Sequence, residues 1–295
     1  MRRVSFRSMA LGVALSFVAA CIPSGPNAKS GNEAQPAGPG ASAPQGEIQA
    51  ADAQPAKSAP ELLQEWNTLA EAGETHLSNP RPREIGMELK KLGPEHLTPI
   101  LDVLGDPNSK PGAKALAMIS LRAVATPDMA ERLKAMCKPD QDGTMRACAA
   151  DLLSHIPNAD TMAFLKTLTN DPEKRVRVAS LIGLVGNGDA DSRKGLIELY
   201  READTNPRQK AAIILTVTDT ASVADLPALS EAVADAALDV DTRKRVALVL
   251  GRIGDESVVE ALTKCTDAPA PEALRGVATD AVTVIRSRAK DTEAK

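Results

Sequence analysis

Between residues 83 and 288 the chain repeats one pattern, a basic residue followed by Ala, Leu, Ile and Val at helical spacing. Apolar residues of the third copy form one wide helical stripe: Met145, Ala149, Ala150, Leu152, Leu153 and Ile156. Successive basic residues are 31, 32, 31, 31, 35 and 32 positions apart: Arg83, Lys114, Arg146, Arg177, Arg208, Arg243 and Arg275. This spacing is typical of a two-helix unit in a stacked solenoid, so the pattern predicts seven such units.

A second helix is predicted to follow each of the first six stripes. The expected ranges are 94–104, 128–137, 158–169, 189–203, 222–238 and 255–266. Proline and aspartate pairs, as in Asp106-Pro107 and Asp171-Pro172, separate the units. Before the first unit, Leu62, Leu63, Trp66 and Leu69 lie on one face of a lone amphipathic helix. We expect this helix to cap the stack.

The repeats resemble the HEAT family, in particular bacterial HEAT-like units that read approximately V-R-x-x-A-A-x-A-L-G-x-I-G. The resemblance covers about residues 82–288, although Lys90 stands where the first unit should have an aliphatic residue. It implies an all-α fold, a right-handed α-α superhelix (HEAT-like solenoid) of about seven two-helix repeats. It also implies that the second helices line the concave surface, and that this surface binds other proteins.

The amino-terminal 20 residues have the order of an export signal. Arg2, Arg3 and Arg7 precede an apolar run from Met9 to Ala20. These twelve residues are too few to span a bilayer. We therefore interpret residues 1–20 as a signal peptide rather than a membrane span.

The sequence Val18-Ala19-Ala20-Cys21 resembles the bacterial lipobox. That resemblance implies a lipoprotein in which Cys21 is diacylated and becomes the new amino terminus. Two acyl chains would give stable anchoring, which a single chain does not. The alternative is a plain signal peptide followed by a chance cysteine.

Composition divides the rest of the chain. Residues 21–60 contain the lipidated cysteine and a Pro/Ala/Gly-rich tether that is expected to be disordered. Residues 61–290 form the repeat domain, and 291–295 a polar tail. The predicted location is the bacterial cell envelope, lipid-anchored and facing the periplasm. Ile22 is not the aspartate that retains many enterobacterial lipoproteins at the inner membrane, which favours the outer membrane.

Charge and aromatic content argue against nucleic acid as a partner. The formal charge of −4 becomes −7 without the three leader arginines, and −6 once the tether's two lysines and three acidic residues are also removed. Past residue 60 the aromatic residues are Trp66, Phe164 and Tyr200. An acidic domain with so few rings lacks the basic surface and the stacking platforms of nucleic-acid binders.

No residue constellation predicts catalysis. His76, His96 and His155 lie outside any metal-binding spacing, and no phosphate-binding loop motif occurs. We therefore expect neither a cofactor nor a metal, and interpret the chain as a non-catalytic envelope scaffold that binds another protein. The alternative is an enzyme or enzyme subunit of the HEAT-like lyase type, because some HEAT-like proteins resemble chromophore lyases. A small-ligand or metal binder is a third alternative.

Three cysteines follow Cys21, namely Cys137, Cys148 and Cys265. Cys137 and Cys148 are separated by a short turn, and an oxidising envelope permits a disulfide if their Cα atoms come within about 7 Å. Three separately packed thiols are the second alternative, and a metal site with His155 is the third.

An acidic stretch lies in the fifth repeat, where the interval between basic residues is 35. Glu231, Asp235 and Asp239 are spaced at i, i+4 and i+8. If one helix continues through them, they form an acidic stripe. The stripe is either a solvated face or a docking strip for a basic partner.

The lipobox generates a direct test. We expect Cys21→Ser to abolish lipid attachment, so that the protein leaves the membrane fraction on a high-salt wash. Fractionation and mass spectrometry of the amino-terminal peptide measure both effects. Retention of the variant in the washed membranes would place the anchor elsewhere.

Overall fold

The computed structural model describes residues 57–72, 79–267 and 269–293. Within those ranges every regular element is a helix. The α-helices are α2 (Ala59–Ala72), α3 (Arg81–Leu92), α4 (Thr98–Gly105), α5 (Pro111–Arg122), α6 (Ala130–Met136), α7 (Gly143–Ser154), α8 (Ala159–Leu168), α9 (Lys174–Gly186), α10 (Ser192–Arg201), α11 (Pro207–Asp219), α12 (Leu226–Ala234), α13 (Val240–Ile253), α14 (Val259–Thr263) and α15 (Glu272–Glu293). Short 3₁₀ helices, η2 (Pro94–Leu97), η3 (Pro127–Met129), η4 (Val223–Asp225) and η5 (Glu256–Val258), precede four of the second helices.

The predicted signal peptide, Cys21 and residues 22–56 of the tether lie outside the described residues. The boundaries predicted at the two ends of the repeat domain need small corrections. Helix α2 begins at Ala59, and α15 continues to Glu293, so residues 291–293 belong to the last helix rather than to a separate tail.

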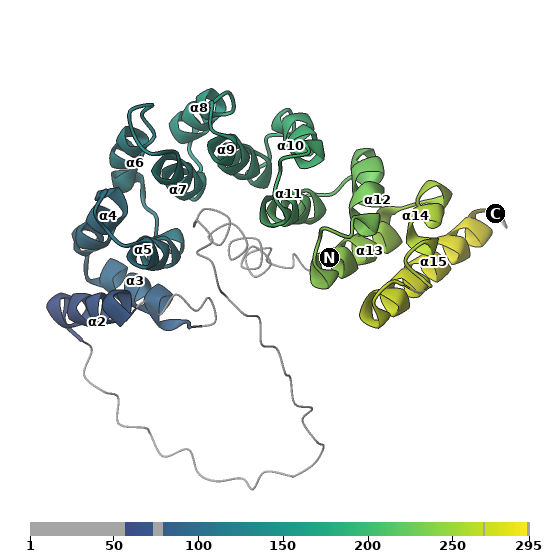
Figure 1. The fold of residues 1–295 in the computed structure, drawn as a ribbon, viewed down its shortest axis with the longest axis horizontal. Coiled ribbons are helices and arrows are strands. Elements are labelled where there is room, and N and C mark those ends of the chain that lie inside the picture. The colour runs from purple at the N-terminus through teal and green to yellow at the C-terminus, as the bar shows by residue number, and fades with distance from the viewer. Residues whose placement is uncertain (1–56, 73–78, 268, 294–295) are drawn as a thin grey trace, which may run out of the picture.

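The helices form two layers along an arc (Figure 1). The first helices of the units, α3, α5, α7, α9, α11, α13 and α15, follow one another along the inner side. The second helices, α4, α6, α8, α10, α12 and α14, lie along the outer side. The predicted all-α HEAT-like solenoid is confirmed. The expectation that second helices line the concave surface is wrong, because the first helices occupy the inside of the arc.

The repeat spacing also needs a correction in the fifth unit. First helices begin at residues 81, 111, 143, 174, 207, 240 and 272, so the fifth unit is no longer than the fourth. From α5 onward the fourth residue of every first helix is basic, and in α11 that residue is Lys210. The apparent 35-residue interval comes from counting Arg208, two residues earlier, in place of Lys210.

The core is aliphatic and continuous along the stack. Leu181 and Leu250, which the stripes place inside, are both buried. Successive first helices approach closely where one of them carries glycine. A Cβ on Gly183 would lie 2.5 Å from the Cβ of Ser154, and one on Gly251 would lie 3.0 Å from the Cβ of Ala281. Any larger residue at Gly183 would therefore push α7 and α9 apart.

Helix α2 closes the amino-terminal end, as predicted. Leu62 and Trp66 are buried, and the Trp66 indole nitrogen donates a hydrogen bond of 2.9 Å to the hydroxyl of Ser120 on α5. Arg81 at the start of α3 binds Glu65 of α2, with an Nε to Oε1 distance of 2.6 Å. The cap thus covers the apolar end of the stack and is also held to it by polar contacts.

The exposure of two nearby leucines tests the register. Leu250 is 0 % exposed and Leu248, on the same helix, is 61 % exposed. Leu250→Ala should lower the free energy of unfolding by about 2–5 kcal/mol. Leu248→Ala, the matched control, should change it by less than about 0.5 kcal/mol. Chemical denaturation measures both, and equal costs would show that the register of α13 is wrong.

Candidate interaction surface

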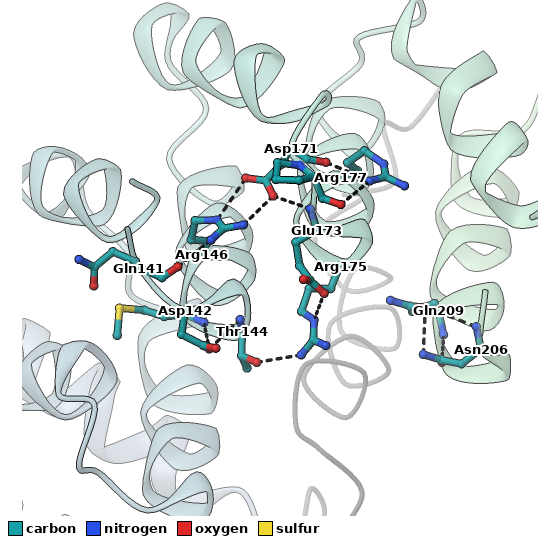
Figure 2. Close-up of polar contacts among 12 residues, drawn as sticks. Gln141, Asp142, Thr144, Arg146, Asp171, Glu173, Arg175, Arg177, Asn206 and Gln209 are labelled. Carbon is teal, nitrogen blue, oxygen red and sulfur yellow. Dashed lines mark hydrogen bonds and ion pairs between the residues drawn. The ribbon is translucent and has the colours of Figure 1, made fainter. Parts of the chain in front are cut away.

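A ladder of ion pairs links each central repeat to the next. Arg146 on α7 donates two hydrogen bonds to Asp171, which lies in the turn before α9, with nitrogen to oxygen distances of 2.8 and 3.1 Å (Figure 2). Both side chains are less than 10 % exposed. Arg146 also donates to the carbonyl of Gln141 at 2.6 Å, and the bonds to Asp171 raise its pKa. The guanidinium therefore fastens its own turn to the following one.

The same contact recurs at the same separation of 25 residues. Arg177 lies 3.9 Å from Glu202, and Lys210 lies 3.2 Å from Asp235. Arg177 also donates to the carbonyl of Asp171 at 2.9 Å. In these three repeats the basic residues are therefore structural links between consecutive turns. The sequence did not single out Lys210, although its distance from Arg177 matches the repeat length.

The predicted acidic stripe is wrong as a single helical face. Helix α12 ends at Ala234, so Glu231 is on the helix while Asp235 is in the following turn. Asp239 then caps the amino end of α13 by accepting from the backbone nitrogen of Thr242 at 2.8 Å.

Each of the three carboxylates has a partner within the chain. Glu231 makes two contacts with Arg201, of 2.8 and 2.7 Å. Asp235 accepts from the Tyr200 hydroxyl at 2.9 Å as well as from Lys210. Burial alone would raise the pKa of Asp235, but hydrogen bonds from Ala237, Tyr200 and Lys210 lower it overall. A docking role for these residues stays a prediction, without the stripe on which it was based.

Ion pairs also connect consecutive second helices in the outer layer. Arg132 on α6 pairs with Asp102 on α4, and Lys134 on α6 pairs with Asp160 on α8. Arg201 on α10 pairs with Glu231 on α12. The charges of these outer helices therefore neutralise one another rather than forming a field of one sign.

The inner layer carries aliphatic side chains at a shared position. The ninth residues of α5, α9, α11 and α13 define an apolar line: Ile119, Ile182, Leu215 and Leu248. Leu248 is the most exposed member, Ile119 and Ile182 are half-buried, and Leu215 is buried. Because first helices pack against second helices behind them and first helices on each side, we infer that the exposed members face the inside of the arc. The repeat pattern in the sequence does not reveal this line, because the buried positions dominate that pattern.

One polar pair interrupts the apolar line. The ninth residue of α7 is Asp151, and it accepts a hydrogen bond of 2.6 Å from Arg122 on α5. Arg122 is 10 % exposed and Asp151 is 4 % exposed at the side chain. The Nε of Arg122 and the Oδ2 of Asp151 are buried without a hydrogen-bond partner. Each side chain therefore keeps one unused hydrogen-bonding atom.

The cysteines match the alternative of separately packed thiols. Cys137, Cys148 and Cys265 are free and buried, so the proposed Cys137–Cys148 disulfide is absent from this structure. The two residues line different hollows: Cys137 lines one beside Phe164 of α8, and Cys148 lines one beside Met118 of α5. Burial raises the pKa of the Cys137 thiol to about 12, which makes it unreactive at neutral pH.

The described residues contain neither a metal-binding cluster of His, Cys, Asp or Glu nor a membrane-spanning helix. No group of three or more His, Cys, Asp or Glu side chains there is arranged to hold a metal ion. No helix there combines the length and apolar character needed to cross a bilayer.

Comparison with known proteins supports the repeats. A family model described as HEAT repeats matches residues 194–283, from α10 into α15. No curated protein matches the chain. Among solved structures, the chain is similar to human deoxyhypusine hydroxylase in complex with glycerol, at 17% identity and a TM-score of 0.35. That match covers 79% of this chain and 93% of the other.

Removing a solvated carboxylate from an acidic stripe would stabilise the protein, whereas removing the Asp239 side chain should destabilise it, because Asp239 caps α13. Asp239→Ala should lower the free energy of unfolding by about 0.5–2 kcal/mol, because α13 loses its amino-terminal cap. Asp241→Ala is the control, since Asp241 is on the same turn, is 91 % exposed and contacts Lys244. Denaturation of both variants measures the difference. A stabilised Asp239 variant would contradict the capping role.

Proposed function

We propose that this protein is a membrane-tethered scaffold of the bacterial envelope that binds another protein through the inner face of its HEAT-like solenoid, without catalysis. The HEAT-repeat match and the solenoid support the scaffold part of this proposal. The tether, the lipid on Cys21 and a periplasm-facing position, with the outer membrane favoured, come from the amino-terminal sequence.

The exposed Leu248 is the observation that carries the choice of face. A leucine that is 61 % exposed on a helix whose neighbouring apolar residues are buried gains stability when a partner covers it. Full burial of such a side chain contributes about 1.5–3 kcal/mol. Ile182 on α9 is half-buried and belongs to the same apolar line, whereas Leu215 between them is buried and leaves Leu248 as the main contact.

The tether sets how far the face can act from the membrane. Residues 22–58 would span roughly 120 Å if fully extended, and a flexible chain of that length would have ends roughly 35 Å apart. The proposed partner can therefore be attached to the same membrane or lie free in the periplasm. Contact with the membrane itself is proposed to occur through the lipid alone.

Charge substitution on the apolar line tests the proposal. Leu248→Glu should reduce recovery of the envelope partner at least tenfold, because a carboxylate would have to be buried at the contact. Val223→Glu is the matched control: Val223 is 64 % exposed but lies in η4, away from the ninth positions of the first helices. Quantitative pull-down from envelope extracts, with melting curves for both variants, makes the measurement.

A protein is identified as the partner if wild type and Val223→Glu both retain it and Leu248→Glu does not. Equal recovery with all three proteins would show that the inner face does not bind it.

A further inference from the structure

The sulfur-containing residues are concentrated at one junction of the stack. Six of the nine methionines and cysteines in the described ranges lie between residues 118 and 148. Three of them, Met118, Met145 and Cys148, line a single cavity of about 530 Å³ between the second and third repeats. This site is separate from the proposed partner-binding face and does not depend on it.

The backbone brings these three side chains to the cavity from two helices. Met145 and Cys148 are three residues apart on α7, so they lie on the same helix face. Met118 comes from α5 and lines the same cavity. All three residues are less than 10 % exposed. Methionine has three rotatable side-chain bonds, so both thioethers can adjust their sulfur positions.

The remaining lining comprises apolar, polar and charged residues. Leu104, Ala115, Pro107 and Pro111 supply apolar walls. The charged residues that line the cavity are Lys114, Asp140 and Asp142, which together carry one net negative charge. That balance disfavours an anionic ligand and favours a cation.

The donor atoms select the kind of cation. Thiolate and thioether sulfurs are soft ligands that prefer Cu(I), whereas Ca²⁺ and Mg²⁺ require oxygen. One lining carboxylate is already engaged, because Asp142 accepts from the backbone nitrogens of Thr144 and Met145 at 2.8 and 3.2 Å. We propose that the cavity is a Cu(I) site whose ligands are the Cys148 thiolate and the thioethers of Met118 and Met145.

Binding at this site involves one proton. The Cys148 thiol loses its proton as the sulfur–copper bond forms, so one proton is released for each Cu(I) bound and copper stays monovalent. Neither methionine changes protonation, since a thioether carries no titrating proton.

A competition experiment tests the site in the full chain. Every sample carries Cys21→Ser, which removes the exported thiol from consideration, and is kept reduced and free of oxygen. Cu(I) is supplied as its coloured complex with bathocuproine disulfonate. We expect the protein to withdraw one equivalent of Cu(I) and to develop the ultraviolet absorption of a copper–thiolate bond.

The ligand variants should change that result in different ways. Cys148→Ser should abolish the ultraviolet band. Met118→Leu and Met145→Leu, which conserve volume and should keep the fold, should each weaken Cu(I) binding at least tenfold. Melting curves verify that each variant is folded. If Cys148→Ser does not fold, the Cu(I) affinities of Met118→Leu and Met145→Leu test the site.

The other buried thiols provide matched controls. Cys137 lines a different hollow, of about 620 Å³, and Cys265 accepts a contact from Arg243 on α13. Cys137→Ser and Cys265→Ser should bind Cu(I) like the parent protein. The proposal fails if the chelator keeps the copper, if the three ligand variants bind as tightly as the parent, or if either control loses binding equally. Those results would leave the sulfurs as apolar packing groups.

Discussion

The close approach of consecutive first helices is the constraint on which the rest of the structure depends. Small residues permit it: Gly183 lies against Ser154, Gly251 lies against Ala281, and a Cβ on Gly86 would fall 2.5 Å from the carbonyl oxygen of Ser120. Side chains of ordinary size would hold these helices further apart. Because the first-helix layer is drawn together while the second-helix layer is not, the stack curves with its first helices inside (Figure 1).

The ion-pair ladder maintains the register of this stack at its turns. Arg146 pairs with the buried carboxylate of Asp171 and also donates to the Gln141 carbonyl. Its guanidinium therefore stabilises the fold and is not available to bind a partner. The acidic residues are engaged in the same way, since Asp235 binds Lys210 and Tyr200. Most charge in the central repeats is therefore unavailable for recognition. In the proposed scaffold, selectivity for a partner would rest on the exposed aliphatic residues, Leu248 above all.

The sequence predicted the features that depend on periodicity. The positions of the first helices, the cap around Trp66 and the burial of Leu250 follow from apolar spacing, and the structure confirms them. Features that depend on competition between local contacts were predicted less well. Residues 235–238 continue an acceptable helical pattern, but Asp235 accepts from the backbone nitrogen of Ala237 at 2.9 Å, which stabilises a turn instead. Arg208 and Lys210 are both basic, and only the position of Asp235 shows which of them continues the ladder.

The junctions of the stack are not equivalent. Between α5 and α7, Lys114 occupies the position of Arg146, but the residue 25 places onward is Pro139 and cannot accept an ion pair. The cavity lined by Met118 and Cys148 lies at this junction, where the buried Arg122–Asp151 pair joins the two first helices. The buried pair between α5 and α7 therefore takes the place of the turn contact that links the later repeats.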